Sequence, residues 1–275
     1  MSSSITIWFR RIILTIVILI VALIGLMIGI IVTDSLFGAD TADFANMTYE
    51  DSQGNTLYGY IARPADPGPH PAVLLIHEWW GLNHGITVLA DALAAEGYVV
   101  FAPDAYRGQV TARVPRALYL RLTIPEDQVH QDIDSALAYL RNQDGVNPDR
   151  VASMGFCFGG GESLKLSLRQ PENLASTIIY YGSVVTDPTL LRSLAEDQPV
   201  LGIFAEDDQQ IPPAEVRQFE AALNSLNIEN QITIYPDVGH AFLTEDNYDQ
   251  LGTAGNDAWQ QTLTFLEDTL KNQGR

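Results

Sequence analysis

The chain is poor in cysteine and in basic residues, and each shortage excludes a class of protein. Its 275 residues include one cysteine, Cys157, so no internal disulfide framework can hold the fold together. Only 15 lysine and arginine residues oppose 34 aspartate and glutamate residues, which gives a formal net charge of −19. Because such a surface repels phosphate backbones, we expect no nucleic-acid partner. No histidine or carboxylate cluster has the spacing of a metal site, so we expect neither metal nor cofactor.

The long apolar run of the sequence lies near its N-terminus. Residues 12–32 contain only apolar side chains, two glycines and Thr15. As a helix this run would span roughly 30 Å, the thickness of the hydrocarbon core of a bilayer. Arg10 and Arg11 precede it and Asp34 follows it. The positive-inside rule therefore places the N-terminus in the cytoplasm and the rest of the chain outside.

A cleaved signal peptide is the alternative for this segment. Its apolar core would be only about 7–15 residues and would precede a small-x-small site. The run is longer, and Phe37 stands where a small residue is wanted. We therefore expect a single-pass protein with a cytoplasmic N-terminus (1–11), a transmembrane signal anchor in the lipid bilayer (12–32), a linker (33–45) and an extracytoplasmic domain (46–275).

The remainder alternates between strand and helix patterns, which predicts an α/β fold. Short connections in such a pattern indicate a mostly parallel sheet with helices on both faces. Within residues 108–123, Thr111–Leu122 is rich in arginine and leucine and is expected to form an inserted cap segment beside the site. The expected strands cover 47–50, 56–63, 72–76, 98–102, 151–154, 175–181, 200–205 and 231–235, and the expected helices cover 86–96, 126–143, 160–169, 214–226 and 256–270.

The lone cysteine lies where one expected strand passes into a helix. Residues 155–161 read Gly-Phe-Cys-Phe-Gly-Gly-Gly, a G-x-nucleophile-x-G pattern with cysteine in the place of serine. Glycines two positions before and after Cys157 let neighbouring backbone pass a sharp, strained turn. The following helix points its N-terminus at the thiol and favours the thiolate, and the backbone N–H of Phe158 becomes an oxyanion-hole donor. The alternative is a buried structural cysteine beside packing glycines.

A base and an acid should follow later strands. Of five histidines, His70 and His130 fall in a proline-rich loop and a helix, and we expect both at the surface. His240 directly follows the last expected strand, where the α/β-hydrolase order of nucleophile, acid and histidine places its base. The acid should follow the preceding strand, and the spacing leaves Glu206, Asp207 and Asp208 open as candidates.

The residues after the strand at 72–76 form a second part of the expected site. His77-Glu-Trp-Trp-Gly-Leu-Asn83 occupies the position of the oxyanion loop, so the backbone N–H of Trp79 is the expected second donor. Glu78, flanked by aromatic residues, is expected to have a raised pKa and to lie near the thiol; the alternative is a salt bridge to an arginine at the rim. Trp79 and Trp80 suit a substrate wall, or simply pack.

Taken together, these segments resemble the dienelactone hydrolase family of α/β-hydrolases over residues 46–272. The resemblance rests on 77–83, on 155–160, on Ala102-Pro-Asp-Ala-Tyr-Arg107, on Tyr180-Tyr-Gly182 and on Gly239-His-Ala-Phe242. It implies a triad of Cys157, His240 and Asp208, the aspartate four residues before Pro212, with Asp207 as the second choice. It also implies hydrolysis of a small-molecule ester or lactone through an acyl-enzyme, with Glu78 taking the thiol proton when substrate arrives.

The same resemblance implies residues that hold the substrate. Tyr106, Arg107 and Trp80 are the expected substrate-binding residues. Family members grip the substrate carboxylate with two arginines; Arg107 matches the first only approximately, and the second position holds Thr244. An ester or lactone hydrolase is therefore expected, with the dienelactone reaction itself in question. The alternatives are a non-catalytic ligand-binding domain on the same fold, and a peptidase or acyltransferase with the same triad.

Overall fold

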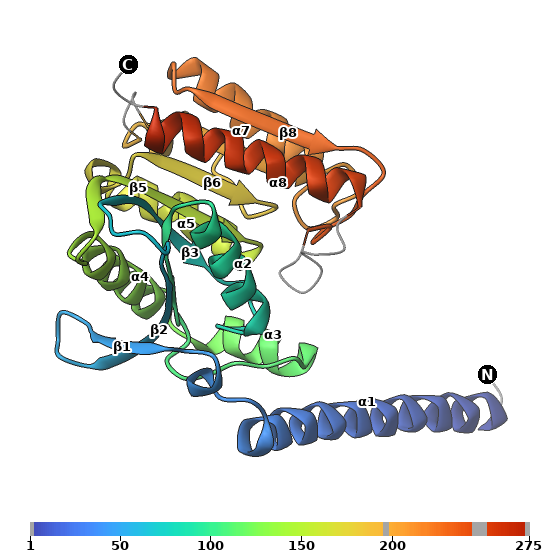
Figure 1. Cartoon of the computed structure of the whole chain (residues 1–275). Coiled ribbons are helices and arrows are strands. Elements are labelled where there is room, and N and C mark those ends of the chain that lie inside the picture. Colours follow the sequence, from blue (N-terminus) through green and yellow to red (C-terminus); the bar gives the residue numbers. More distant parts are fainter. Residues whose placement is uncertain (1–2, 195–197, 244–251, 273–275) are drawn as a thin grey trace.

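A computed structural model describes residues 3–194, 198–243 and 252–272 (Figure 1). Thr244, the position expected to hold a substrate arginine, lies outside these residues. Within them the chain forms an N-terminal helix and one α/β domain. The domain is built on a sheet of eight strands, and the helix projects away from it.

The sheet has the order β1-β2-β4-β3-β5-β6-β7-β8. The strands are β1 (Met47–Glu50), β2 (Thr56–Ala62), β3 (His70–Ile76), β4 (Val99–Pro103), β5 (Val146–Phe156), β6 (Ser176–Tyr180), β7 (Val200–Ala205) and β8 (Asn230–Tyr235). The pairs β1–β2 and β2–β4 are antiparallel and every other pair is parallel. The predicted mostly parallel sheet is therefore confirmed, and the carboxyl ends of β3, β5, β6, β7 and β8 meet along one edge.

Helices cover both faces of this sheet, as the pattern of the buried strands requires. The domain helices are α2 (His84–Ala95), α3 (Val114–Thr123), α4 (Glu126–Arg141), α5 (Phe158–Arg169), α6 (Pro188–Leu191), α7 (Pro213–Ser225) and α8 (Thr253–Leu266). Val73 and Leu75 of β3 pack in a core with α2 and α8, whereas Leu74 and Ile76 pack with α4 on the other face. Alternate side chains of a strand point to opposite faces, so the continuous apolar run of β3 supplies both cores.

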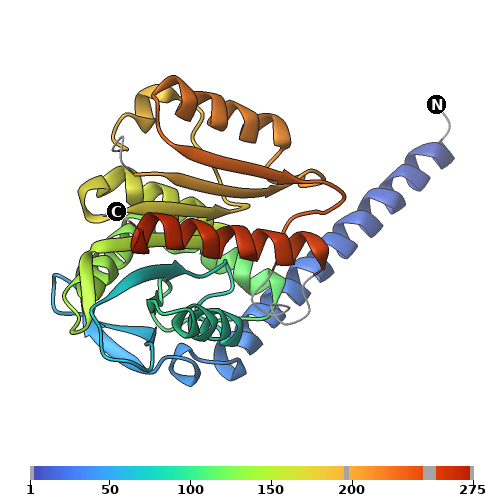
Figure 2. The same ribbon diagram turned by 45° about the horizontal axis from the view of Figure 1, so that its top comes forward.

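The N-terminal helix α1 spans Ser3–Phe37 and leaves the domain beside α3 (Figures 1 and 2). Within Trp8–Phe37, an 18-residue stretch has a mean hydropathy of 3.2 and is not buried by the rest of the described chain. This length and composition fit a membrane anchor or a signal sequence. The helix continues through residues 33–37, and a short 3-10 turn follows at Thr41–Asp43. The first five residues of the expected linker, 33–37, therefore belong to α1, and residues 41–43 of it form the 3-10 turn.

Candidate active site

Cys157 occupies a sharp turn between β5 and α5. Its backbone angles are φ 51° and ψ −112°, a conformation that a non-glycine residue adopts only where its surroundings impose it. A Cβ on Gly155 would lie 2.1 Å from the Gly159 carbonyl oxygen, and one on Gly159 would lie 2.2 Å from the Ile76 carbonyl oxygen. The two flanking glycines are thus required for the turn, as the sequence pattern predicted.

This close passage makes Gly159→Ala a strongly destabilising substitution. The added methyl group would meet the carbonyl oxygens of Ile76 and His77, and backbone atoms cannot move aside as a flexible side chain can. We expect the free energy of unfolding to fall by at least about 2 kcal/mol, measured by denaturant titration. Gly252→Ala is the matched control, because nothing lies within 4 Å of its added Cβ, and it should cost no more than about 1 kcal/mol. Equal losses in the two variants would contradict this account of the turn.

A chain of hydrogen bonds joins Cys157, His240 and Asp208. The Nε2 atom of His240 lies 3.2 Å from the Cys157 Sγ atom, and its Nδ1 atom lies 2.7 Å from the Asp208 Oδ2 atom. Asp208 is buried, and its Oδ1 atom accepts the backbone N–H groups of Gln210 at 2.7 Å and Ile211 at 3.0 Å. Of the three candidate carboxylates, Asp208 is the one that reaches His240.

The partner of Nδ1 determines what His240 can do. The Asp208 carboxylate can only accept a hydrogen bond, so Nδ1 carries the ring proton and donates it to this bond, and Nε2 presents a lone pair toward the thiol. In this arrangement Nε2 can take the proton of Cys157, and the Asp208 carboxylate stabilises the resulting imidazolium. The thiol also lies at the N-terminus of α5, whose dipole favours the thiolate. The geometry therefore suits a nucleophilic thiolate.

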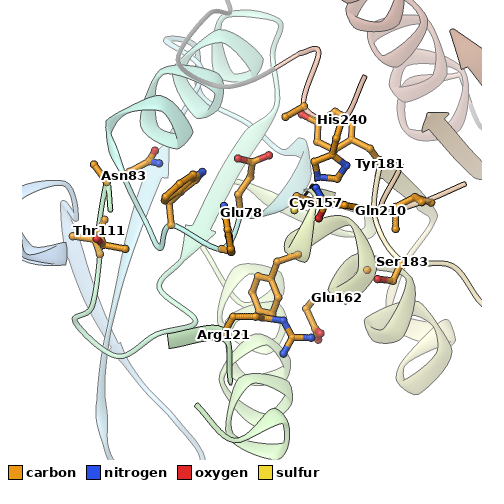
Figure 3. A pocket seen from close by; sticks show the side chains of 18 of the residues that line it. Glu78, Asn83, Thr111, Arg121, Cys157, Glu162, Tyr181, Ser183, Gln210 and His240 are labelled. Atoms are coloured by element: carbon orange, nitrogen blue, oxygen red, sulfur yellow. Dashed lines mark hydrogen bonds between the residues drawn. The ribbon is translucent and has the colours of Figure 1, made fainter. Parts of the chain in front are cut away.

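These residues open into a cavity of about 710 Å³ at the carboxyl edge of the sheet (Figure 3). Trp79, Trp80, Phe158 and Tyr181 give it aromatic walls. Polar side chains enter it from several elements: Glu78, Asn83, Thr111, Arg121, Glu162, Lys165, Ser183 and Gln210. A concave site with apolar walls and a few polar groups suits a small organic substrate.

The two residues expected to supply the oxyanion hole, Phe158 and Trp79, come from different elements and both line the cavity. Phe158 is the first residue of α5, where an N–H group has no partner within the helix. Trp79 follows β3, and both residues line the cavity. Their positions fit the oxyanion-hole role that the sequence predicted for them.

Glu78 lines this cavity and is 4% exposed. In Figure 3 its side chain lies between Asn83 and Cys157. The backbone around it is held by the fully buried ring of His77, whose Nδ1 atom lies 2.5 Å from the Glu78 carbonyl oxygen. The His77 Nε2 atom accepts the backbone N–H of Ala105 at 3.1 Å. His77 is thus a neutral ring that positions Glu78, a role that the sequence reading did not assign to it.

Burial lowers the pKa of His77 to about 4, and this shift predicts an acid dependence of stability. Between about pH 6.5 and pH 4 the unfolded chain binds a proton at this ring and the folded chain does not, so stability present above pH 6.5 is lost as the pH falls through that range. The free energy of unfolding of the wild-type protein should therefore fall by about 3 kcal/mol between pH 6.5 and pH 4 because of His77. We expect this contribution to be absent from His77→Gln. Denaturant titrations at both pH values measure this difference, and parallel pH profiles for the two proteins would contradict it.

Tyr106 and Arg107 do not lie where the sequence reading placed them. Tyr106 is buried, and its ring packs against His77 and Phe158. The Arg107 guanidinium donates to both oxygens of Asp132, at 2.7 and 2.8 Å, and lies 3.3 Å from Asp51. Among the described residues that line the cavity, neither appears. The structure therefore does not bring these two expected substrate-binding residues to the cavity: Tyr106 is packed in the interior, and Arg107 is held by Asp132 in a bidentate ion pair.

The cationic side chains that line the cavity are Arg121 of α3 and Lys165 of α5. Arg121 of α3 lies over the ring of Phe158, 5.3 Å from its centre. Lys165 of α5 bonds to Glu162 at 3.0 Å and to Glu126. Neither residue lies in a sequence motif that would have predicted its place in the cavity, although Arg121 belongs to the arginine-rich segment expected to cap the site.

Near Lys165 the fold also forms a cluster that the sequence reading missed. Potential ligand atoms of Glu126, His130 and Glu162 lie within 4.8 Å of one another. His130, expected at the surface, is half-buried, and its Nε2 atom lies 3.2 Å from Glu162. Because the ammonium group of Lys165 already bonds to both carboxylates, we assign the cluster to an ion-pair network between α4 and α5.

Comparisons with known proteins identify the family and the fold of this chain. The profile of the Dienelactone hydrolase family matches residues 57–270. A Salmonella typhi protein named "Putative carboxymethylenebutenolidase" is 32% identical over 240 residues, covering 82% of this chain and 88% of its own length. An Aquifex aeolicus protein of the same name is 32% identical over 232 residues, covering 80% and 97%. The crystal structure of a protein from Klebsiella pneumoniae, described as a "Putative Dienelactone Hydrolase", superposes with a TM-score of 0.69 at 28% identity, covering 80% of this chain and 98% of that one.

Proposed function

Because this chain belongs to the dienelactone hydrolase family of α/β-hydrolases, we propose that it hydrolyses carboxylic esters or lactones with Cys157 as nucleophile, His240 as general base and Asp208 as the acid of the triad. The observation that carries the proposal is the hydrogen-bonded chain of these three side chains at a strained turn that faces the cavity. Each member has the partner that its role requires.

The proposed reaction proceeds through a thioester. His240 Nε2 takes the thiol proton, and the Cys157 sulfur forms a bond to the carbonyl carbon while the N–H groups of Phe158 and Trp79 stabilise the oxyanion. The carbon–oxygen bond to the leaving alcohol breaks, and the imidazolium returns its proton to that oxygen. A water molecule then attacks the thioester, with His240 again as base. This second step releases the acid and restores the thiol.

Glu78 is proposed as a second acceptor for the thiol proton, used when substrate enters the cavity. It is a buried carboxyl group that lines the same cavity as Cys157, and the family resemblance implies this role. Glu78→Gln removes the acceptor with little change in volume, so we expect kcat for a short ester to fall at least tenfold. Steady-state kinetics over a range of pH measure this, and an unchanged kcat and pH profile would contradict the role.

The helix α1 is proposed as an uncleaved signal anchor that holds the domain outside the membrane. Its apolar run is longer than the core of a signal peptide, and arginines precede it. The mass of the protein purified from membranes tests this. An intact N-terminus, together with digestion of the domain by protease added outside spheroplasts, is expected, and a mature protein that begins after residue 32 would contradict it.

A substrate panel tests the hydrolase proposal. The wild-type protein should hydrolyse p-nitrophenyl acetate, a small lactone and a thioester, and should leave a peptide amide uncleaved. Each ester is paired with an analogue that carries a carboxylate, which shows whether the cationic side of the cavity favours anions. Failure on every ester, lactone and thioester would refute the proposal and favour a ligand-binding domain, whereas cleavage of the amide alone would favour a peptidase.

A further inference from the structure

Helix α3 presents an apolar stripe that no described part of the domain covers. Val114, Leu118 and Leu122 recur at intervals of four residues and therefore share one side of the helix. They are 56%, 41% and 73% exposed, and Tyr119 beside them is 46% exposed. The opposite side of α3 is buried through Arg116, Ala117 and Leu120. A helix that is buried in its own domain on one side and exposes apolar residues on the other suits the boundary between a polar and an apolar medium.

The position of α3 relative to α1 indicates which boundary that is. Figures 1 and 2 both show α3 beside the C-terminal part of α1. On α1, Met27, Ile30, Ile31 and Asp34 are the partly covered residues of its last turns. This spacing of three and four residues marks one face of the helix, and it reaches back into the apolar run.

Polar contacts fix the two helices at a defined depth. The Arg116 guanidinium lies 3.4 Å from the Asp34 carboxylate and 3.4 Å from the carbonyl oxygen of Ile31. Thr111 also donates to the Asp34 carboxylate. Ile31 is next to the last residue of the apolar run. The side of α3 that carries Arg116 is therefore held where α1 would leave the hydrocarbon core.

The charge of this segment differs from that of the rest of the chain. Residues 108–123 contain three arginines and no acidic residue, in a chain whose net charge is −19. Arg116 is buried against Asp34, whereas Arg113 and Arg121 are exposed, and exposed arginines beside an apolar stripe complement anionic headgroups and the acyl boundary beneath them. An acidic protein partner would match the arginines but leave Val114, Leu118 and Leu122 without an apolar medium.

We propose that α3 is an interfacial helix, seated in the headgroup region of the bilayer that α1 spans, and that the catalytic cavity consequently takes amphiphilic esters from the membrane surface. The proposal rests on the anchor and the hydrolase activity proposed above. Ala39 and Phe44, which follow α1, line the cavity together with Val110, Thr111 and Ala112, which precede α3. A lipid-like ester that leaves the bilayer beside the joined ends of α1 and α3 would thus meet the cavity at once, with its acyl chain against Trp79 and Trp80.

Spin-label accessibility tests the position of α3 directly. The full chain with Cys157→Ser would carry a nitroxide at one introduced cysteine, Leu122→Cys, in vesicles of phosphatidylcholine and phosphatidylglycerol. Leu190→Cys on α6, an equally apolar and 61% exposed site, is the control, and Leu19→Cys reports the middle of α1. We expect the label at 122 to collide more with oxygen and less with a water-soluble nickel chelate than the label at 190.

The outcomes separate this inference from the proposals beneath it. A label at 19 buried in lipid, with a label at 122 as accessible to the chelate as that at 190, would overturn the interfacial helix and leave the anchor standing. A label at 19 exposed to water would overturn both.

Activity provides a second and independent readout. In the pair Leu118→Asp and Leu122→Asp, the ratio of the rate on a vesicle-embedded long-chain ester to the rate on a soluble short ester should fall about tenfold. Leu190→Asp should leave the ratio unchanged. An unchanged ratio in the α3 pair would overturn delivery from the membrane surface. A wild-type protein that hydrolyses neither the long-chain ester nor the short ester would instead refute the hydrolase proposal.

Discussion

Replacing Cys157 with alanine is expected to lower kcat/KM for a short activated ester by at least about 10³-fold while the domain remains folded. The Cys157 sulfur is the atom that would bond to the carbonyl carbon, and among the described residues no other cysteine can take its place. Alanine tolerates the turn less well than glycine but introduces no atom that the cysteine lacks. Initial rates with p-nitrophenyl acetate measure the loss.

The control for this variant is its fold. Circular dichroism and the thermal unfolding midpoint should match those of the wild-type protein within a few degrees, because only one half-buried sulfur atom is removed. If a folded Cys157→Ala protein kept more than a tenth of the wild-type activity, the nucleophile would have to be another group. A buried structural cysteine would then be the better explanation of the turn.

The second large effect is expected for Asp208→Asn. An asparagine amide turned toward His240 would donate a hydrogen bond where the carboxylate accepts one, so Nε2 would carry the ring proton and could not take that of the thiol. We expect kcat/KM to fall by about 10³- to 10⁴-fold with little change in stability. Steady-state kinetics above and below neutral pH measure the change.

Asp207→Asn is the matched control for this experiment. Asp207 is the neighbouring residue and is exposed to solvent, whereas Asp208 is buried against His240. The control should keep its activity within about twofold. Equal losses in the two variants, or a larger loss for Asp207→Asn, would show that Asp208 is not the acid of the triad.

Much of the fold could be predicted from the sequence because its signals are local. The apolar runs that became β3 and β7 are buried on both faces, and the helix patterns between them correspond to α2, α4, α5, α7 and α8. The turn at Cys157 was also predictable, since two glycines at fixed distances from the nucleophile leave few other conformations. His240 and the group of three carboxylates followed from the rule that sites form beyond the carboxyl ends of parallel strands.

The substrate side of the site was predicted less well because it depends on contacts between distant residues. Arg107 precedes its partner Asp132 by a loop and the whole of α3, and no local pattern announces their bidentate pair. Likewise, the cationic groups of the cavity, Arg121 and Lys165, come from helices whose placement only the tertiary fold decides. The sequence marked Thr111–Leu122 as an insertion, but its packing against α1 depends on contacts of Arg116 and Thr111 with Asp34, which no local pattern predicts.

If Cys157 is the nucleophile, it carries the acyl group of the substrate during turnover, and this acyl group can be trapped. The protein is mixed with an excess of p-nitrophenyl acetate, quenched in acid within milliseconds to seconds, and analysed by intact and peptide mass spectrometry. We expect one acetyl group on the peptide that contains Cys157. Neutral hydroxylamine should remove it, and Cys157→Ala should not acquire it. Continued ester turnover with no acetyl group on Cys157, or with a stable acetyl group on another residue, would contradict it.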